Sequence, residues 1–373
     1  MWRPSASIEA LKFRAQANKI IRHFFAVRDI MEVETPILSH FATTDPFIES
    51  FSCDIQVGTK KLGEKSKAYL HTSPEFAMKR LVAAGAGPIF QLCKVFRQEE
   101  LGRWHNPEFT LLEWYRPGLS YHQLIDETAE LIQNLLVNSY PLLQPYDANL
   151  LELVVTDNLQ PDNQAQTHKQ SLLPVIKISY ADLFKQHIGV DPHLANVKLL
   201  ASLVKKVGIN LSIELNDLDK DSCLQLLLTH IIEPAMPKQK LVFIYDYPSS
   251  QASLAQLDRR DNYQVAQRFE CFFNGVELAN GFQELTSATE QQQRFEQNNS
   301  HRADKNLRVY PFDQLLIDSM QSSDGHDGLP DTAGVAVGVD RVLVFALEMS
   351  GCQVPNKDKN SLSSVLAFNF ERA

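Results

Sequence analysis

The chain lacks the features of a membrane protein, a disulfide-framed protein or a general nucleic-acid binder. No apolar run in the 373 residues approaches membrane-spanning length, and the N-terminus MWRPSASIEALKFRAQ has no apolar signal core. The five cysteines are scattered, odd in number and without a Cys-x-x-Cys pair, which argues against a disulfide frame or a zinc site. The net charge is −9, so no broad basic face for nucleic acid is expected. We expect a cytoplasmic protein with reduced thiols.

The composition is that of a protein with a full hydrophobic core. Hydrophobic residues make up 44% of the chain and charged residues 22%. A segment at about 139–174 stands apart, because it holds four prolines and the almost wholly polar run DNLQPDNQAQTHKQ. Such a composition predicts a flexible insertion. We therefore expect one domain over residues 1–373, interrupted by this insertion.

Hydrophobic periodicity predicts most of the elements. An apolar face at helical spacing predicts a helix from a cap at Ser5 or Ser7 to about Asp29, and alternation predicts a short strand over 31–35, ended by Pro36. Further helices are predicted over 76–84, 120–137, 178–187, 197–207, 221–232, 288–299 and 342–349. The run KLVFIY, residues 240–245, predicts a buried strand.

The stretch Ile89–Arg116 predicts two strands joined by a long hairpin loop. Arg97 and Glu99 are two residues apart, so on a strand they share one face. Phe109 lies on the returning strand. A cation for phosphate, an acceptor for an amine and a flat apolar ring suit a nucleotide. A salt-bridged hairpin without a ligand explains the same residues equally well.

The tripeptide Ser73-Pro74-Glu75 precedes a predicted helix. Ser73 suits the N-cap, Pro74 the first helical position and Glu75 the positive helix end. A well-formed helix start therefore explains all three residues without any ligand.

Three glutamates in the last third of the chain, Glu270, Glu277 and Glu284, are spaced seven residues apart. In one helix this spacing would give an exposed face. The dipeptide Asn274-Gly275 instead indicates a hairpin turn, so Glu270 and Glu277 can point at one site from two strands.

A glycine-containing strand over 334–341 leads into an apolar helix. Gly338 would let the backbone approach a ligand closely, and Arg341 would lie at the helix start. Glycine at such a place is common as pure packing, but the arginine beside it favours a phosphate site.

Together these segments resemble the three signature motifs of class II aminoacyl-tRNA synthetases. The first helix, its strand and Pro36 resemble motif 1, the Arg97 hairpin resembles motif 2, and Gly338-Val339-Asp340-Arg341 resembles motif 3. Details such as Ser73-Pro74-Glu75 are similar to lysyl-tRNA synthetases. The resemblance implies an α+β fold, with an antiparallel sheet flanked by helices, and a homodimer paired through motif 1.

Motif 1 begins within about the first dozen residues, which leaves no room for the anticodon-binding barrel of a lysyl-tRNA synthetase. A free-standing catalytic domain with WRPSAS and HNPEFTLLEWYRP resembles the elongation factor P lysine ligase family. That family activates (R)-β-lysine with ATP and attaches it to the ε-amine of a lysine on elongation factor P. Ala336 stands where lysyl-tRNA synthetases carry glycine, and its methyl group would reshape the amino-acid pocket. No stable tRNA binding is expected.

The resemblance implies catalytic roles for Arg97 on the α-phosphate and Arg341 on the γ-phosphate. Glu99 and the main chain near Asn106 would hold adenine, with Phe109 stacked on it. The other residues expected at the ATP are Gln98, by backbone contact only, Glu277, Leu278 and Gly338. Glu270 and Glu277 would hold Mg²⁺, because oxygen ligands suit that ion.

The resemblance places the amino acid against Ser73, Pro74, Glu75, Tyr115, Glu284 and Ala336. A buried carboxylate without a cation is costly, so Glu75 and Glu284 imply a substrate with ammonium groups, lysine or (R)-β-lysine. Two other functions share these motifs. One is an aminoacyl-tRNA synthetase that uses only the acceptor stem, and the other is a non-catalytic subunit on the same fold.

Overall fold

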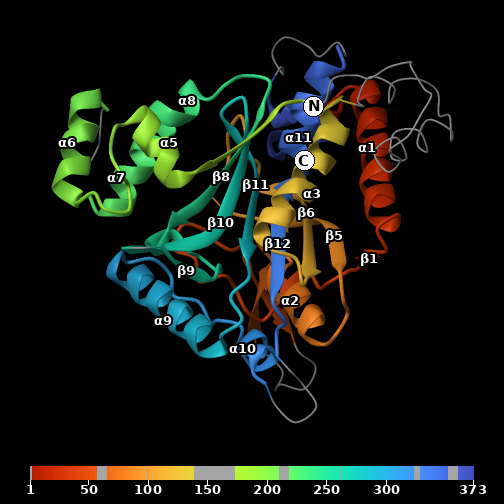
Figure 1. The fold of residues 1–373 in the computed structure, drawn as a ribbon. Helices are drawn as coiled ribbons and strands as arrows, with labels where there is room; N and C mark the ends of the chain where they lie inside the picture. The colour runs from red at the N-terminus through yellow and green to blue at the C-terminus, as the bar shows by residue number, and fades with distance from the viewer. Residues whose placement is uncertain are drawn as a thin grey trace, which may run out of the picture.

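The computed structural model describes residues 2–56, 65–98, 100–137, 173–209, 218–260, 262–322, 328–351 and 360–373. Within this part of the chain, nine strands form one central sheet in the order β1-β5-β6-β12-β11-β10-β8-β7, with β9 paired to β10 (Figure 1). Only the outer pairs β1–β5 and β7–β8 are parallel, and all other pairs are antiparallel. The predicted α+β fold, with an antiparallel sheet flanked by helices, is confirmed.

The strands of this sheet, from one edge to the other, are β1 (Met31–Glu32), β5 (Ile89–Phe96), β6 (Glu108–Pro117), β12 (Thr332–Gly338), β11 (Val276–Gln283), β10 (Tyr263–Phe273), β8 (Leu241–Pro248) and β7 (Val175–Ser179), with β9 (Leu257–Arg260) beside β10. A small second sheet holds β2 (Leu38–Ser39), β4 (Lys65–Leu70) and β3 (Ser52–Gln56).

Three helices, α1 (Ile8–Ala26), α3 (Tyr121–Val137) and α11 (Val339–Met349), pack together against one face of the sheet (Figure 1). The Ser7 hydroxyl caps α1 by accepting a hydrogen bond from the amide of Ala10. The main hydrophobic core lies between these helices and inward-facing strand residues such as Trp114. These three helices therefore cover one side of the sheet.

A second group of helices packs on β8 and β10 around its own apolar cluster. It consists of α5 (Tyr180–His187), α6 (Val197–Val207), α7 (Lys220–Leu227), a π-helical turn (Leu228–Ile232) and α8 (Glu233–Ala235). A third group packs around a smaller cluster toward the other end of the sheet: α2 (Glu75–Ala83), α9 (Ala288–Asp304) and α10 (Gln314–Met320) (Figure 1). Short 3-10 helices span Ser249–Gln251, Leu362–Ser364 and Phe370–Arg372.

Several predicted boundaries were wrong. Strand β1 ends at Glu32 rather than at residue 35, and α9 runs to Asp304 rather than to residue 299. Ile178 lies in β7 rather than in a helix, because β7 pairs in parallel with β8 and Ile178 faces Ile244. Helix α2 begins at Glu75, with Pro74 rather than Ser73 at its N-cap position. Helix α11 begins at Val339, directly after β12 and three residues before the predicted start at residue 342.

The remaining sequence-based expectations concern the insertion, the domain organisation, the cysteines and membrane-spanning helices. The insertion expected at 139–174 lies almost wholly outside the described residues. The single-domain organisation stays a prediction. The four cysteines in the described part of the chain are free thiols. Among the described residues there is no helix with the length and apolar character that a membrane crossing requires.

Candidate active site

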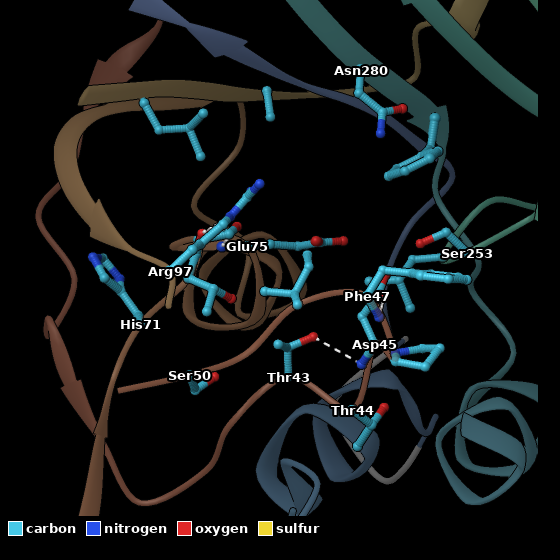
Figure 2. A pocket seen from close by; sticks show the side chains of 18 of the residues that line it. Thr43, Thr44, Asp45, Phe47, Ser50, His71, Glu75, Arg97, Ser253 and Asn280 are labelled. Carbon is cyan, nitrogen blue, oxygen red and sulfur yellow. Dashed lines mark hydrogen bonds between the residues drawn. The ribbon is translucent and has the colours of Figure 1, made fainter. Parts of the chain in front are cut away.

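A cavity of about 1600 Å³ opens on the side of the sheet away from α1, α3 and α11. It is lined by alternate residues of neighbouring strands, because successive side chains of a strand point to opposite faces. The lining residues from β6 and β12 include Phe109, Leu111, Glu113, Tyr115, Gly334, Ala336 and Gly338. Figure 2 shows the side chains of Arg97, Glu75 and Asn280 around this cavity, with the loop that carries Asp45 and Phe47 on another side.

The structure brings nearly all of the predicted site residues together on this one cavity. Those that line it are Ser73, Pro74, Glu75, Arg97, Asn106, Phe109, Tyr115, Glu270, Glu277, Leu278, Glu284, Ala336, Gly338 and Arg341. Glu99 lies outside the described residues. Gln98 is not a lining residue: its side-chain amide donates to the carbonyl oxygen of Ser50 at 2.7 Å, and its N–H donates to that of Glu49. Gln98 therefore anchors the motif 2 hairpin to the preceding segment.

Arg97 directly follows β5, which ends at Phe96. Its Nε donates to the carbonyl oxygen of Thr72 at 3.4 Å, and its Nη1 lies 3.6 Å from Glu100. The guanidinium carbon lies 5.1 Å from the ring centre of Phe109, so the cation and the ring form one surface. The side chain remains one-quarter exposed. Arg97 thus presents a charged fork to the cavity beside an aromatic face.

Arg341 is held at the start of α11 by three hydrogen bonds and by an ion pair, in which its Nη1 lies 3.7 Å from Oε2 of Glu277. Its guanidinium donates to the carbonyl oxygens of Trp104 at 3.2 Å and Glu277 at 2.8 Å, and lies 2.9 Å from Nε2 of His105. Burial and the charge of Arg341 both lower the pKa of His105. Neutral His105 can accept a hydrogen bond from the arginine. Arg341 therefore joins motif 3 to the motif 2 loop and to the β10–β11 hairpin.

The Asn106 side chain is buried, and each end of its amide has a hydrogen-bond partner within the protein. Its Nδ2 donates to the carbonyl oxygen of Glu108 at 2.6 Å, and its Oδ1 accepts from the N–H of Phe370 at 3.0 Å. Contact of adenine with the main chain near Asn106 stays a prediction. Phe370 was not predicted, because nothing in its local sequence links it to motif 2.

Glu270 and Glu277 come from β10 and β11 and line the same cavity, as the hairpin predicted. Glu270 accepts hydrogen bonds from the Tyr247 hydroxyl at 2.7 Å and from Arg268 at 2.5 Å. Burial raises the pKa of Glu270 to about 6; the Arg268 charge opposes this rise, and the Glu277 charge adds to it.

This pair of glutamates fits Mg²⁺. Their mutual repulsion favours a bound cation, and Mg²⁺ is commonly held by one or two carboxylates together with substrate phosphates. No cluster of three or more acidic, histidine or cysteine ligands occurs in the described ranges. Phosphate oxygens would therefore have to complete the coordination.

A lysine that the sequence analysis missed lies beneath the part of the cavity lined by Glu75 and Glu284. Lys79 is 1% exposed, and its ammonium lies 2.6 Å from Oε1 of Glu75 and 2.5 Å from Oε2 of Glu284. The premise that these two carboxylates lie buried without a cation is therefore wrong. Lys79 follows Glu75 by four residues on α2, a spacing that puts the two on one helix face and was visible in the sequence.

Glu113 is the second missed residue. It is 2% exposed on β6 and lines the cavity. Its carboxylate accepts hydrogen bonds from the Ser73 hydroxyl at 2.6 Å and the Tyr115 hydroxyl at 3.1 Å. Burial raises its pKa to about 8, the Glu75 charge adds to the rise, and Arg97 opposes it. Its position two residues before Tyr115 on the same strand was the available signal.

Gly334 on β12 gives Glu284 and Tyr115 the space that they occupy. A Cβ atom at this position would lie 2.2 Å from Oε1 of Glu284 and 2.5 Å from the Tyr115 ring. At Gly338 the nearest atoms to such a Cβ would be 3.8 Å away, so no protein atom in the described residues requires a glycine there. The space beside Gly338 remains open for a ligand.

The whole chain is similar to known proteins of one kind. The family model described as tRNA synthetases class II (D, K and N) matches residues 1–353. Proteins named elongation factor P–(R)-β-lysine ligase from Salmonella gallinarum, Salmonella paratyphi B and Salmonella schwarzengrund are each 42% identical over 372 residues, which covers 100% of this chain and 98% of each relative. The chain belongs to the class II tRNA synthetase family (D, K and N), and along its length it is similar to these ligases.

Proposed function

We propose that this protein is an ATP-dependent ligase that activates (R)-β-lysine, or lysine, as an adenylate. It then transfers the activated group to the ε-amine of a lysine on elongation factor P. Two findings support the proposal: similarity over the full length to the ligases of that name, and the joining of the three motifs at one cavity.

The observation that carries the proposal is the charge of the amino-acid end of the cavity. Glu75, Glu113 and Glu284 supply three carboxylates, and Lys79 supplies one ammonium group. If all four groups are ionised, this buried part of the cavity carries a net charge of −2. A diamino acid brings two ammonium groups, which would neutralise the pocket. An amino acid with an apolar side chain would leave one charge unpaired.

In the activation step, a carboxylate oxygen of the amino acid would attack the α-phosphate of ATP and release pyrophosphate. This step needs charge neutralisation and alignment. Arg97 would neutralise the α-phosphate, and Arg341, fixed by its contacts with Trp104 and Glu277, would bind the γ-phosphate. The Phe109 ring and the main chain at Asn106 would hold the base. Glu99, outside the described residues, stays a predicted contact to adenine.

Glu270 and Glu277 would hold Mg²⁺, which when bound supplies positive charge to the phosphate oxygens. Leu278 and Gly338 would border the nucleotide. Ser73 and Pro74 would border the amino acid, with the Tyr115 hydroxyl and the Ala336 methyl group shaping its pocket. In the transfer step, the acceptor amine would attack the activated carbonyl carbon and displace AMP.

A homodimer paired through motif 1 is part of the proposal. Four large apolar side chains on or beside β1 and β2 are more than two-fifths exposed, as expected of a surface between copies: Val27, Met31, Ile37 and Leu38. The cytoplasmic location and the absence of stable tRNA binding stay predictions.

ATP–pyrophosphate exchange tests the proposed activation. We expect exchange that depends on added (R)-β-lysine or lysine, and no exchange without an amino acid. The matched control is Arg341→Met, which should abolish exchange because it removes the γ-phosphate cation. If neither amino acid supports exchange in the unmodified protein, the proposal is wrong, and a non-catalytic role takes its place.

A further inference from the structure

Lys79 lies beneath the amino-acid pocket rather than on its surface. It does not line the cavity, but its two partners, Glu75 and Glu284, do. Glu75 comes from the first turn of α2, whereas Glu284 directly follows β11, so the lysine joins a helix to the central sheet. The contact takes only Oε1 of Glu75 and Oε2 of Glu284. The other oxygen of each carboxylate is left free of Lys79.

The surroundings of Glu284 explain why a cation is needed there. Glu75 on α2 and Tyr115 on β6 face it, and β12 contributes only the uncharged Gly334. Burial raises the pKa of Glu284 to about 8, Lys79 opposes the rise, and Glu75 adds to it. Both carboxylates in turn raise the pKa of Lys79 against the effect of its burial. Lys79 is thus a fixed charge among groups that burial would otherwise neutralise.

We propose that Lys79 is a positioning residue for substrate selection. By binding one oxygen of Glu75 and one of Glu284, it fixes both carboxylates so that their other oxygens meet the ammonium groups of a diamino acid. The inference rests on the proposed function and goes beyond it, because it assigns the selection to a residue that does not touch the substrate.

The replacement Lys79→Met tests this role, because it keeps much of the volume of the side chain and removes its charge. Without the cation, Glu284 holds its proton more tightly, and a substrate ammonium group has to displace that proton to bind. We expect the KM for (R)-β-lysine near neutral pH to rise roughly tenfold or more. The KM for ATP should stay within about twofold, since Arg97 and Arg341 are untouched.

The pH profile separates positioning from a merely structural role. In Lys79→Met the KM for the amino acid should fall again as the pH rises, and its midpoint should move upward by about one pH unit. Loss of packing alone would change stability or the rate of exchange without moving that midpoint. If Lys79→Met does not yield folded protein, Lys79→Gln keeps hydrogen-bond donors without the charge and should shift the midpoint in the same direction.

Arg28→Met is the matched control, because Arg28 forms a 2.5 Å ion pair with Glu130 away from the cavity. It should leave both KM values unchanged. A wild-type KM and pH profile in folded Lys79→Met, or a parallel rise in both KM values, would overturn the inference. Binding of (R)-β-lysine is also measured by calorimetric titration, which keeps the two claims apart. Absence of exchange in the wild-type protein would count against the proposed function. Unchanged binding by Lys79→Met would count against the role of Lys79.

Discussion

The Ser73 hydroxyl donates a 2.6 Å hydrogen bond to the Glu113 carboxylate, and this contact joins the start of α2 to the middle of the central sheet. The same hydroxyl accepts a hydrogen bond from the N–H of Glu75 at 3.0 Å. One serine therefore connects the Glu113 carboxylate on β6 to the main chain at Glu75, where α2 begins. Its position before a helix suggested a cap, but its hydroxyl also bonds Glu113 on the wall of the cavity.

Ser73→Ala should weaken amino-acid binding specifically. The variant leaves a buried carboxylate without one of its two donors, and a hydrogen bond to a charged group contributes about 1.5–3 kcal/mol. We expect the KM for (R)-β-lysine to rise about tenfold or more, with the KM for ATP unchanged. Ser120→Ala, which removes two exposed hydroxyl hydrogen bonds, one to the side chain and one from the N–H of Gln123, is the matched control. Equal effects of the two variants would contradict the role of Ser73.

Gly334→Ala should exclude the substrate and strain the fold. The added methyl group would meet Oε1 of Glu284 and the Tyr115 ring at contact distances that side chains do not tolerate. Overpacking of this kind costs about 1–3 kcal/mol. We expect a lower melting temperature and no exchange with either amino acid. Gly338→Ala, whose methyl group would have free space, should melt like the wild-type protein. A normal KM in Gly334→Ala would show that the pocket lies elsewhere.

Binding of the amino acid should release protons near neutral pH. Burial raises the pKa of both Glu113 and Glu284 to about 8 in the free protein. Ammonium groups favour the ionised carboxylates, so the KM for (R)-β-lysine should fall as the pH rises from about 6 to about 8. Calorimetric titrations at pH 7 in two buffers with different ionisation enthalpies measure the protons released. Proton uptake on binding would contradict this assignment.

The same two carboxyls affect stability with the opposite sign. Their pKa values are raised on folding, so the stability that they contribute is present below the unfolded pKa of about 4.5 and is lost as the pH rises through about 8. The melting temperature of the free protein should therefore fall over this window, and saturating (R)-β-lysine should reduce the fall. A fall unaffected by the ligand would argue against binding at these groups.

Phe370→Pro should weaken ATP binding from the far end of the chain. Proline removes the N–H that fixes Asn106, and the first position of the 3-10 helix and the extended Asn369 before it both accommodate proline. Loss of one hydrogen bond of about 1 kcal/mol predicts a rise of roughly fivefold in the KM for ATP. Phe370→Ala keeps the N–H and should leave the KM unchanged. No difference between the two variants would show that the Asn106 contact does not hold the ATP site.

The local sequence pattern correctly placed residues whose positions depend on their neighbours in the chain. The Asn274-Gly275 turn placed Glu270 and Glu277 at one site, and the Arg97 hairpin was visible from its two apolar runs. Lys79 and Glu113 were missed because each reads as an ordinary helix or strand residue. Their importance depends on partners more than thirty residues away, Glu284 and Ser73 respectively.

Long-range pairing also explains the errors in the fold. Ile178 has the local pattern of a helix start, but parallel pairing with Ile244 of β8 outweighs that preference. The Asn106–Phe370 contact spans most of the chain and leaves no periodic signal. The charge balance of the pocket likewise depended on the pairing of Lys79 with Glu284, which the local pattern did not reveal.

The central claim concerns the destination of the activated amino acid, and mass spectrometry of the acceptor tests it most directly. The protein would be incubated with ATP, Mg²⁺, (R)-β-lysine and elongation factor P, with tRNA in a parallel reaction. We predict that elongation factor P gains the mass of one β-lysyl group on a single lysine side chain, that Arg97→Met prevents the gain, and that tRNA stays uncharged. Unmodified elongation factor P together with aminoacylated tRNA would contradict the claim.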